Sequence, residues 1–393
     1  MALQAMLIAD VPSLPESVSL CSNGLSGGLD LSKATSFRMP RFAVIGHRGN
    51  GMNALQSSDR RMRGFKENSI LSFDAASKFP IDYIEFDVQV TKDRCPVIFH
   101  DDFIYSEENG TVHEKRVTDL SLSQFLCYGP QKEPRKTGKT LLRKSKEGKI
   151  LKWDVELDDS LCTLQEAFER VEQTLGFNIE LKFDDFTVYE QDFLIDVLQA
   201  VLQVVFEYAK DRPVIFSSFQ PDAAQLLRKL QSTYPVYFLT DAGATIFYDK
   251  RRNSIDEAIK VCLEGGLQGI VSEVKGVFKN PSAVSRIKDS NLSLLTYGKL
   301  NNVGEAVYMQ YVMGIEGVIV DFVEEITEAV TLMIRPPSSS SSPLSLSPSS
   351  SPSRSSSSSS ITEEDDFATT KPNFSQKEIA FLLKLVSELI QQQ

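Results

Sequence analysis

The chain has few of the residues that covalent cross-links and soft-metal sites require. It carries five cysteines, an odd number with no CxxC pair among them, and only three histidines. A disulfide framework and a zinc knuckle are therefore both disfavoured, and a reducing compartment fits this cysteine usage best.

Long apolar runs and an excess of basic residues are also absent. No stretch reaches the about 18 uninterrupted apolar residues of a membrane-spanning helix, which argues against an integral membrane protein. The 53 acidic residues outnumber the 42 basic ones and give a formal net charge of -11, which argues against a nucleic-acid binder. With 393 residues, 41% of them hydrophobic, the chain is long enough for one large core or two smaller ones.

Both ends of the chain differ in composition from its middle. Residues 1–40 lack the basic start and long apolar core of a secretory signal, and their serine-rich composition leaves a transit peptide and a disordered tail as alternatives. Residues 335–373 are a serine- and proline-rich segment that predicts a disordered linker. Residues 374–391 carry a capping box and an apolar stripe, which predict an amphipathic helix that docks on the main domain or contacts a partner or membrane surface.

Residues 41–334 alternate short β-branched runs with longer segments of helical period. Nine strands are predicted, at 42–47, 83–90, 96–100, 177–182, 213–217, 235–240, 268–272, 292–297 and 317–321. Helices are predicted between most of them, including 68–78, 163–173, 192–210, 222–231 and 255–264. Nearly continuous apolar strands separated by helices indicate a parallel sheet covered on both faces, and this many of them favour an α/β fold of the (β/α)8 TIM barrel type.

A barrel of this type has eight strands, so one of the nine is misassigned or lies outside it. Residues 91–95 are too few for a crossover helix, which suggests a hairpin between 83–90 and 96–100 with a two-residue turn at Lys92 and Asp93. This register places His100 opposite Glu85.

Residues 103–160 contain no strong barrel element and form a predicted insertion over the barrel mouth. Lysines and arginines recur between residues 132 and 152. The insertion is either a solvated charged loop or an electrostatic collector for an anionic substrate.

Three carboxylates fall on predicted strands at positions that a buried strand would normally fill with apolar residues. Because side chains alternate across a strand, Glu85 and Asp87 share one face, as do Glu180 and Lys182. Buried carboxylates cost several kcal/mol each unless their charge is compensated. A cation held by Glu85, Asp87 and Glu180 would do so, and an oxygen-only set selects Mg²⁺ or Ca²⁺ over zinc. The alternative is salt bridging to Arg48 and Lys182.

Two of the three histidines lie next to these carboxylates. His47 and His100 each end a predicted strand, and imidazoles can remove a proton from one group and deliver one to another near neutral pH. Arg48 and Lys182 add the fixed positive charge that a phosphodiester needs in its transition state. Glu67 either hydrogen-bonds within this site or begins the next helix. The combination indicates phosphoryl transfer.

These residues, in this order, resemble the glycerophosphodiester phosphodiesterases, plant members above all. Each motif alone is short, but the ordered set is specific and spans residues 41–334. The motifs are His47-Arg48-Gly49, Glu67-Asn68, Glu85-x-Asp87, His100-Asp101, Glu180-x-Lys182, Ser217-Ser218-Phe219 and the segment 317–321 that ends in Asp321.

The resemblance implies a TIM barrel related to phosphoinositide phospholipase C, with a divalent ion on the three carboxylates and the two histidines as acid and base. It implies that Arg48 and Lys182 contact phosphate, and that deacylated phospholipids such as glycerophosphocholine or glycerophosphoethanolamine yield sn-glycerol 3-phosphate and an alcohol. A plastid location follows from the plant members, with the cytoplasm as the alternative.

The chain departs from the family pattern near the seventh strand. Many relatives have a Trp-Thr-x-Asn segment there, whereas this chain has Tyr297 and its only tryptophan is Trp153. Tyr297 is expected to form an apolar wall for glycerol, and Val320 replaces the usual threonine before the final aspartate. The oligomeric state and head-group preference are left open.

Two other functions compete with this one. A phospholipase-like enzyme for intact or lysophospholipids would need an apolar ridge, and the sequence shows none outside the final helix. A non-catalytic barrel that binds anions or a partner would have lost site residues, yet every matched acid, base and cation is present.

Overall fold

The computed structural model describes residues 37–133, 135–145 and 147–335. Most of the N-terminal tail, the linker beyond residue 335 and the predicted C-terminal helix lie outside these residues.

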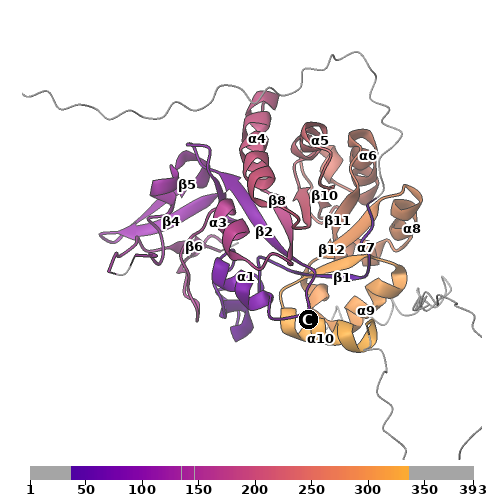
Figure 1. Ribbon diagram of the computed structural model, residues 1–393, viewed down its shortest axis with the longest axis horizontal. Coiled ribbons are helices and arrows are strands. Elements are labelled where there is room, and N and C mark those ends of the chain that lie inside the picture. The colour runs from indigo at the N-terminus through magenta and orange to yellow at the C-terminus, as the bar shows by residue number, and fades with distance from the viewer. Residues whose placement is uncertain (1–36, 134, 146, 336–393) are drawn as a thin grey trace, which may run out of the picture. The chain divides into compact units, whose positions relative to one another are not determined.

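Eight parallel strands form a closed barrel, which confirms the TIM-barrel prediction (Figure 1). Each strand pairs with the next in chain order, and the last pairs back with the first to close the sheet. The strands are β1 (Ala43–Gly46), β2 (Tyr83–Val90), β8 (Gly176–Leu181), β9 (Val214–Ser218), β10 (Val236–Thr240), β11 (Gly269–Glu273), β12 (Ser293–Tyr297) and β13 (Gly317–Val320).

Helices surround the barrel, and Figure 1 shows α4, α5, α6 and α8 outside the strands. Ser69, Thr163 and Ser254 begin three of them by accepting a backbone hydrogen bond in the first turn. No helix within the described residues is long and apolar enough to cross a bilayer. The helices are α1 (Ile70–Ala76), α2 (Leu122–Phe125), α3 (Leu164–Arg170), α4 (Gln191–Tyr208), α5 (Pro221–Leu230), α6 (Ile255–Gly265), α7 (Val274–Lys279), α8 (Ser282–Asp289), α9 (Gly304–Met313) and α10 (Val323–Met333), with short 3-10 helices at Arg60–Arg63, Val117–Asp119, Lys250–Arg252 and Lys299–Asn302.

Side-chain alternation divides the apolar residues between two cores. Ile45, Tyr83 and Tyr237 belong to a cluster inside the barrel, whereas Phe86 and Phe177 belong to the larger cluster between strands and helices. Glu85 and Asp87 follow Tyr83 at every second position of β2. They therefore also point into the barrel, near the carboxyl ends of the strands.

The hairpin after β2 differs from the prediction by one residue. β3 (Pro96–Ile98) pairs antiparallel with β2, with Val88 opposite Ile98. The two-residue turn predicted at Lys92 and Asp93 is wrong, because Arg94 adopts a left-handed conformation with φ of 63° and lengthens the loop to three residues. The pairing of β2 with β3 is therefore shifted by one residue from the predicted register. The backbone amide of Phe99 donates to the Asp87 carbonyl, so His100 does not lie opposite Glu85.

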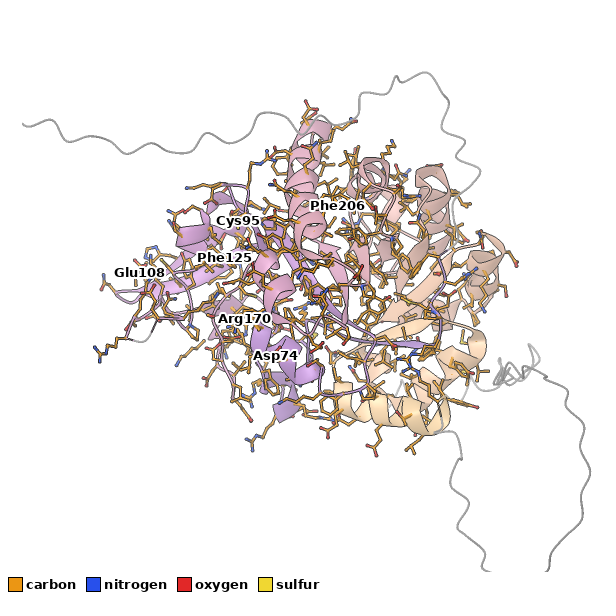
Figure 2. The ribbon with its side chains drawn as sticks, in the orientation of Figure 1. Asp74, Cys95, Glu108, Phe125, Arg170 and Phe206 are labelled. Atoms are coloured by element: carbon orange, nitrogen blue, oxygen red, sulfur yellow. The ribbon has the colours of Figure 1, made fainter. Side chains whose placement is uncertain are left out.

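The insertion contains an ordered second sheet and is not a loop, but its basic side chains at positions 132, 135, 136, 139, 144, 149 and 152 are exposed, as a solvated charged segment predicts. Its strands follow the order β5-β4-β6-β7. Asn109 and Gly110 have the positive φ angles that a tight hairpin turn between β4 and β5 requires. Figure 2 shows Glu108 at the outer end of this sheet and Phe125, which is buried, nearer the barrel. The strands are β4 (Phe103–Glu108), β5 (Thr111–Arg116), β6 (Leu142–Lys144) and β7 (Ile150–Lys152).

Candidate active site

A tight turn after β1 brings two predicted site residues to the barrel mouth. Arg48 has a left-handed backbone with φ of 50°, and Gly49 follows with φ of 92°. A Cβ on Gly49 would lie 2.6 Å from the Ser72 hydroxyl, so only glycine fits against α1. The backbone amide of Arg48 donates to Glu85 Oε2 over 3.0 Å, which joins the turn to β2.

Glu85 and Asp87 from β2 and Glu180 from β8 form one acidic cluster. The strand register pairs Asp87 with Glu180, and one carboxylate oxygen from each of the three residues lies within 4.8 Å of the others. Glu85 and Asp87 are only 3% and 1% exposed. The three carboxylates therefore share a site with little water to screen them.

The charge of this cluster is not fully compensated by the protein. Burial, together with the Asp87 charge, raises the pKa of Glu85 to about 8. Burial also raises the pKa of Glu180. The Asp87 charge adds to this rise, and the Lys182 charge opposes it without cancelling it. Glu85 Oε1 is buried and has no hydrogen-bond partner among the described residues.

Salt bridges neutralise part of the negative charge of the cluster. Lys182 Nζ lies 2.8 Å from Glu180 Oε1 and 3.6 Å from Asp87 Oδ1, and Arg48 Nε lies 3.4 Å from Asp87 Oδ2. No such partner reaches Glu85 Oε1 within the described ranges. An oxygen-only set with one orphaned buried oxygen fits a hard divalent cation.

His47 is held by an aspartate that directly follows the last barrel strand. Its Nδ1 lies 2.7 Å from Asp321 Oδ1, and its Nε2 lies 3.9 Å from Glu85 Oε2. Burial lowers the pKa of His47, but the Asp321 carboxylate more than offsets this, so the pKa lies above its usual value of 6.5. Nδ1–H donating to Asp321 leaves Nε2 directed at the acidic cluster.

The pKa of His100 is shifted by its surroundings in the opposite direction to that of His47. Its Nδ1 lies 2.7 Å from Asp101 Oδ1. Burial and the nearby charges of Arg48 and Lys182 hold the pKa of His100 well below its usual value. The pKa values of the two imidazoles are therefore shifted in opposite directions, which suits a pair that transfers protons in opposite directions.

Glu67 lies inside the site rather than only at the start of a helix. Its side chain is 1% exposed, and its Oε1 lies 2.8 Å from Arg48 Nη1 and 3.0 Å from Arg143 Nη2. Burial acts to raise the pKa of Glu67, but the two guanidinium groups lower it to about 2. This buried carboxylate fixes the Arg48 side chain.

Arg143 is a site residue that sequence reasoning missed. It comes from β6 of the insertion, and its Nη2 lies 2.8 Å from Asp101 Oδ1, the carboxylate that contacts His100. Its guanidinium also lies 4.3 Å from the ring centroid of Trp153, which is buried after β7. In the sequence Arg143 is one of many neighbouring basic residues, and nothing local distinguishes it.

A cavity of about 500 Å³ opens beside this cluster. Tyr297 contacts Phe219 edge to face, with 6.0 Å between ring centroids. Five predicted residues lie outside this lining and connect to it through the salt bridges and hydrogen bonds given above: His47, Arg48, Glu67, Glu85 and Asp87. The lining comprises residues of the charged cluster and its neighbours (His100, Asp101, Asp102, Glu180, Lys182), insertion residues (Phe103, Tyr105, Lys144, Ser145) and residues of barrel strands and their following loops (Leu181, Phe183, Asp185, Phe219, Asp241, Thr245, Phe247, Arg252, Tyr297).

Comparison with known proteins gives consistent results. Residues 47–325 match the model of the glycerophosphoryl diester phosphodiesterase family. The chain is 75% identical to glycerophosphodiester phosphodiesterase GDPD2 of Arabidopsis thaliana over the full length of both, and 60% identical to the chloroplastic GDPD1 of the same plant, again over both full lengths. A glycerophosphoryl diester phosphodiesterase structure from Silicibacter pomeroyi superposes with a TM-score of 0.56 at 19% identity, covering 75% of this chain and 95% of that one.

Proposed function

The chain belongs to the glycerophosphodiester phosphodiesterase family and is a phosphodiester hydrolase, and from this we propose a metal-dependent reaction that uses a histidine pair. The observation that supports the proposal best is the buried cluster of three carboxylates beside two imidazoles whose pKa values are shifted in opposite directions. Such a combination serves phosphoryl transfer and has no structural purpose that an apolar core would not serve better.

Glu85, Asp87 and Glu180 would hold the cation, Mg²⁺ or Ca²⁺. A divalent ion there draws electron density from a phosphoryl oxygen and neutralises the charge that develops on it. Binding would also lower the pKa of Glu85, whose carboxyl group is otherwise held protonated by burial and by Asp87.

His47 and His100 carry the protons. One imidazole removes a proton from the attacking oxygen, and the other gives a proton to the alcohol as its bond to phosphorus breaks. Asp321 holds His47 with Nε2 facing the site, and Asp101 holds His100 in the same way. Each histidine thus has a carboxylate that fixes its ring and its tautomer.

Arg48 and Lys182 would bind the phosphate oxygens. Burial acts to lower the pKa of both, but the neighbouring carboxylates raise it, so both stay charged at any physiological pH. Glu67 fixes the Arg48 guanidinium, and Tyr297 with Phe219 offers the apolar wall on which the carbon chain of glycerol would lie.

We propose glycerophosphocholine, glycerophosphoethanolamine and similar diesters as substrates, with sn-glycerol 3-phosphate and an alcohol as products. An Oleispira antarctica phosphodiesterase with the same fold was solved with sn-glycerol-3-phosphate bound, which supports this product. The reaction would serve phospholipid breakdown and the recycling of phosphate.

The test is release of glycerol 3-phosphate from glycerophosphocholine by the purified full chain, with Mg²⁺, with Ca²⁺ and with excess chelator. We expect release that requires a divalent ion. Glu180→Gln should weaken cation affinity in titration calorimetry, with Glu190→Gln, an exposed glutamate after the same strand, as the matched control. Release that persists in chelator, or unchanged affinity in Glu180→Gln, would contradict the metal assignment.

We also propose that the chain acts in the plastid, with the cytoplasm as the alternative. The support is the chloroplastic relative that is 60% identical over its full length. A fluorescent fusion of residues 1–60 tests the proposal, because entry into plastids is expected and a diffuse cytoplasmic signal would refute it.

A further inference from the structure

Trp153, the only tryptophan of the chain, packs against the charged network of the candidate active site. It directly follows β7 and is 4% exposed. Its ring centroid lies 4.3 Å from the guanidinium carbon of Arg143, the insertion residue that pairs with Glu67 and Asp101. A positive charge over an indole face is attracted by the ring electrons, and the attraction is strongest where water is excluded. The indole therefore holds the Arg143 side chain where it reaches both carboxylates.

The indole N–H makes a second connection to the site. Trp153 Nε1 donates to Asn53 Oδ1 over 2.9 Å, and the same oxygen accepts from the Glu67 amide over 3.1 Å. Asn53 is 5% exposed, its backbone amide donates to the Glu67 carboxylate, and its carbonyl oxygen accepts from Arg143 Nη1 over 3.2 Å. Asn53 therefore joins the indole to both members of the Glu67–Arg143 pair. A ring without an N–H would leave this buried network incomplete.

Two further contacts of the indole are with residues that precede site residues in the chain. Lys66, which precedes Glu67, is 2% exposed. Its Nζ lies 4.0 Å from the ring centroid and 3.7 Å from Asp158 Oδ1, and it has no hydrogen-bond partner in the described part of the chain, so the ring face helps to stabilise this buried charge. The ring of Phe99, which precedes His100, lies 5.8 Å from the indole between centroids.

We propose that Trp153 is a positioning residue that fixes Arg143 between the two carboxylates of the site, and thereby fixes the phosphate ligand and the proton-transfer histidine that these carboxylates hold. The inference rests on the proposed function, because it assigns a role within that reaction. An aliphatic residue could fill the same space in the core, but it could neither attract the guanidinium nor donate to Asn53.

The first test compares two aromatic residues of the same buried cluster. Trp153→Phe keeps a ring against Phe99 but loses the N–H and weakens the attraction for Arg143, so kcat/KM for glycerophosphocholine should fall by about tenfold. The matched control is Phe125→Leu, because Phe125 belongs to the same cluster and lies 6.0 Å from the Phe99 ring, but its side chain has no polar atom to join the network. The control should lose melting temperature and keep its kcat/KM.

A double-mutant cycle shows whether Trp153 acts through Arg143. In an Arg143→Met background, Trp153→Phe should lower kcat/KM by less than about twofold, because the side chain that it positions is gone. A purely structural role would give the same loss in both backgrounds.

A spectroscopic measurement tests the coupling without altering the fold. Since Trp153 is the only tryptophan, 5-fluorotryptophan incorporated during expression labels that position alone. Glycerol 3-phosphate should shift its ¹⁹F resonance, because a phosphate on Arg48 weakens the pairing of Arg48 with Glu67 and so changes the contact of Glu67 with Arg143. The shift should be absent in Arg143→Met.

The outcomes separate this inference from the proposed function. The inference is overturned if the unmodified chain releases glycerol 3-phosphate and Trp153→Phe does so with the same kcat/KM, or if Phe125→Leu loses as much kcat/KM as Trp153→Phe. Equal losses for Trp153→Phe in the two backgrounds, or a ¹⁹F resonance that saturating glycerol 3-phosphate does not move, would also overturn it. Failure of the unmodified chain to release glycerol 3-phosphate would instead refute the proposed function.

Discussion

Replacing Asp321 with asparagine should disable His47 while leaving the barrel folded. The Asp321 carboxylate accepts from the Met52 amide and from Asn302 Nδ2, each over 3.0 Å, in addition to His47 Nδ1 at 2.7 Å. Asparagine has the same shape but only one accepting oxygen and no charge. Since its oxygen is best placed toward His47 and Met52, its amide group faces the Asn302 amide, and the imidazolium form of His47 loses its counter-charge.

The size of the effect follows from the lost charge. A hydrogen bond to a charged group contributes about 1.5–3 kcal/mol, so losing the charge should lower kcat/KM by about 10- to 150-fold. The pH profile should change in a defined direction. Because Asp321 raises the pKa of His47, the substitution lowers it, and the limb that reports His47 should move to lower pH.

The assay is kcat/KM for glycerophosphocholine against pH, with the melting temperature as a check on folding. A double-mutant cycle shows whether Asp321 acts through His47. In a His47→Ala background Asp321→Asn should cost almost nothing further, since the residue that it positions is gone. A loss below threefold in the single variant would refute the reasoning, as would an equal loss in the two backgrounds.

Three further predictions concern the rest of the site. His47→Ala and His100→Ala should each abolish glycerophosphocholine hydrolysis, and a substrate with a p-nitrophenolate leaving group should restore turnover only in the variant that lacks the acid; full activity in either variant would contradict the pair. Arg143→Met should lower kcat/KM for glycerophosphocholine by about tenfold or more, whereas Arg135→Met, an exposed change in the same insertion, should have no effect. Because native Glu85 keeps its proton up to about pH 8, the metal-free protein should lose melting temperature as pH rises from about 5 to 8, and Mg²⁺ or Glu85→Gln should abolish that slope; a slope unchanged by either would exclude Glu85 as its source.

The barrel could be predicted because its strands repeat a simple pattern. β2 is buried at every residue, and its predicted bounds, 83–90, are those of the structure. The hairpin register could not be predicted in the same way. It depends on Arg94, which takes a left-handed backbone that its side chain does not favour and that no neighbouring glycine announces.

The second sheet escaped sequence analysis for a different reason. Its strands β6 and β7 have only three residues each and carry charged side chains, so their period of two is too short to recognise. Their order is set by packing around buried residues such as Phe125 and Trp153, which contact Phe99 next to the barrel. Tertiary packing of this kind leaves little trace in local sequence.

The candidate site was also predictable only in part. Positions within one strand could be predicted, whereas contacts made by the second sheet could not. The shared face of Glu85 and Asp87 follows from strand alternation alone, because the two residues are neighbours on one strand. The contact between Arg143 and Asp101 joins residues 42 positions apart, through a sheet that the sequence did not predict.

The insertion therefore contributes a charged side chain, Arg143, to the candidate site. Arg143 connects β6 to Asp101 and Glu67 at once, and these two carboxylates in turn hold His100 and Arg48. A change in the insertion that moves β6 would displace the proposed proton-transfer group His100 and the proposed phosphate ligand Arg48 together. Since neighbours in one charged network do not act independently, substitutions in the insertion should alter catalysis in proportion to how far they move Arg143, whatever their effect on the net charge of the mouth.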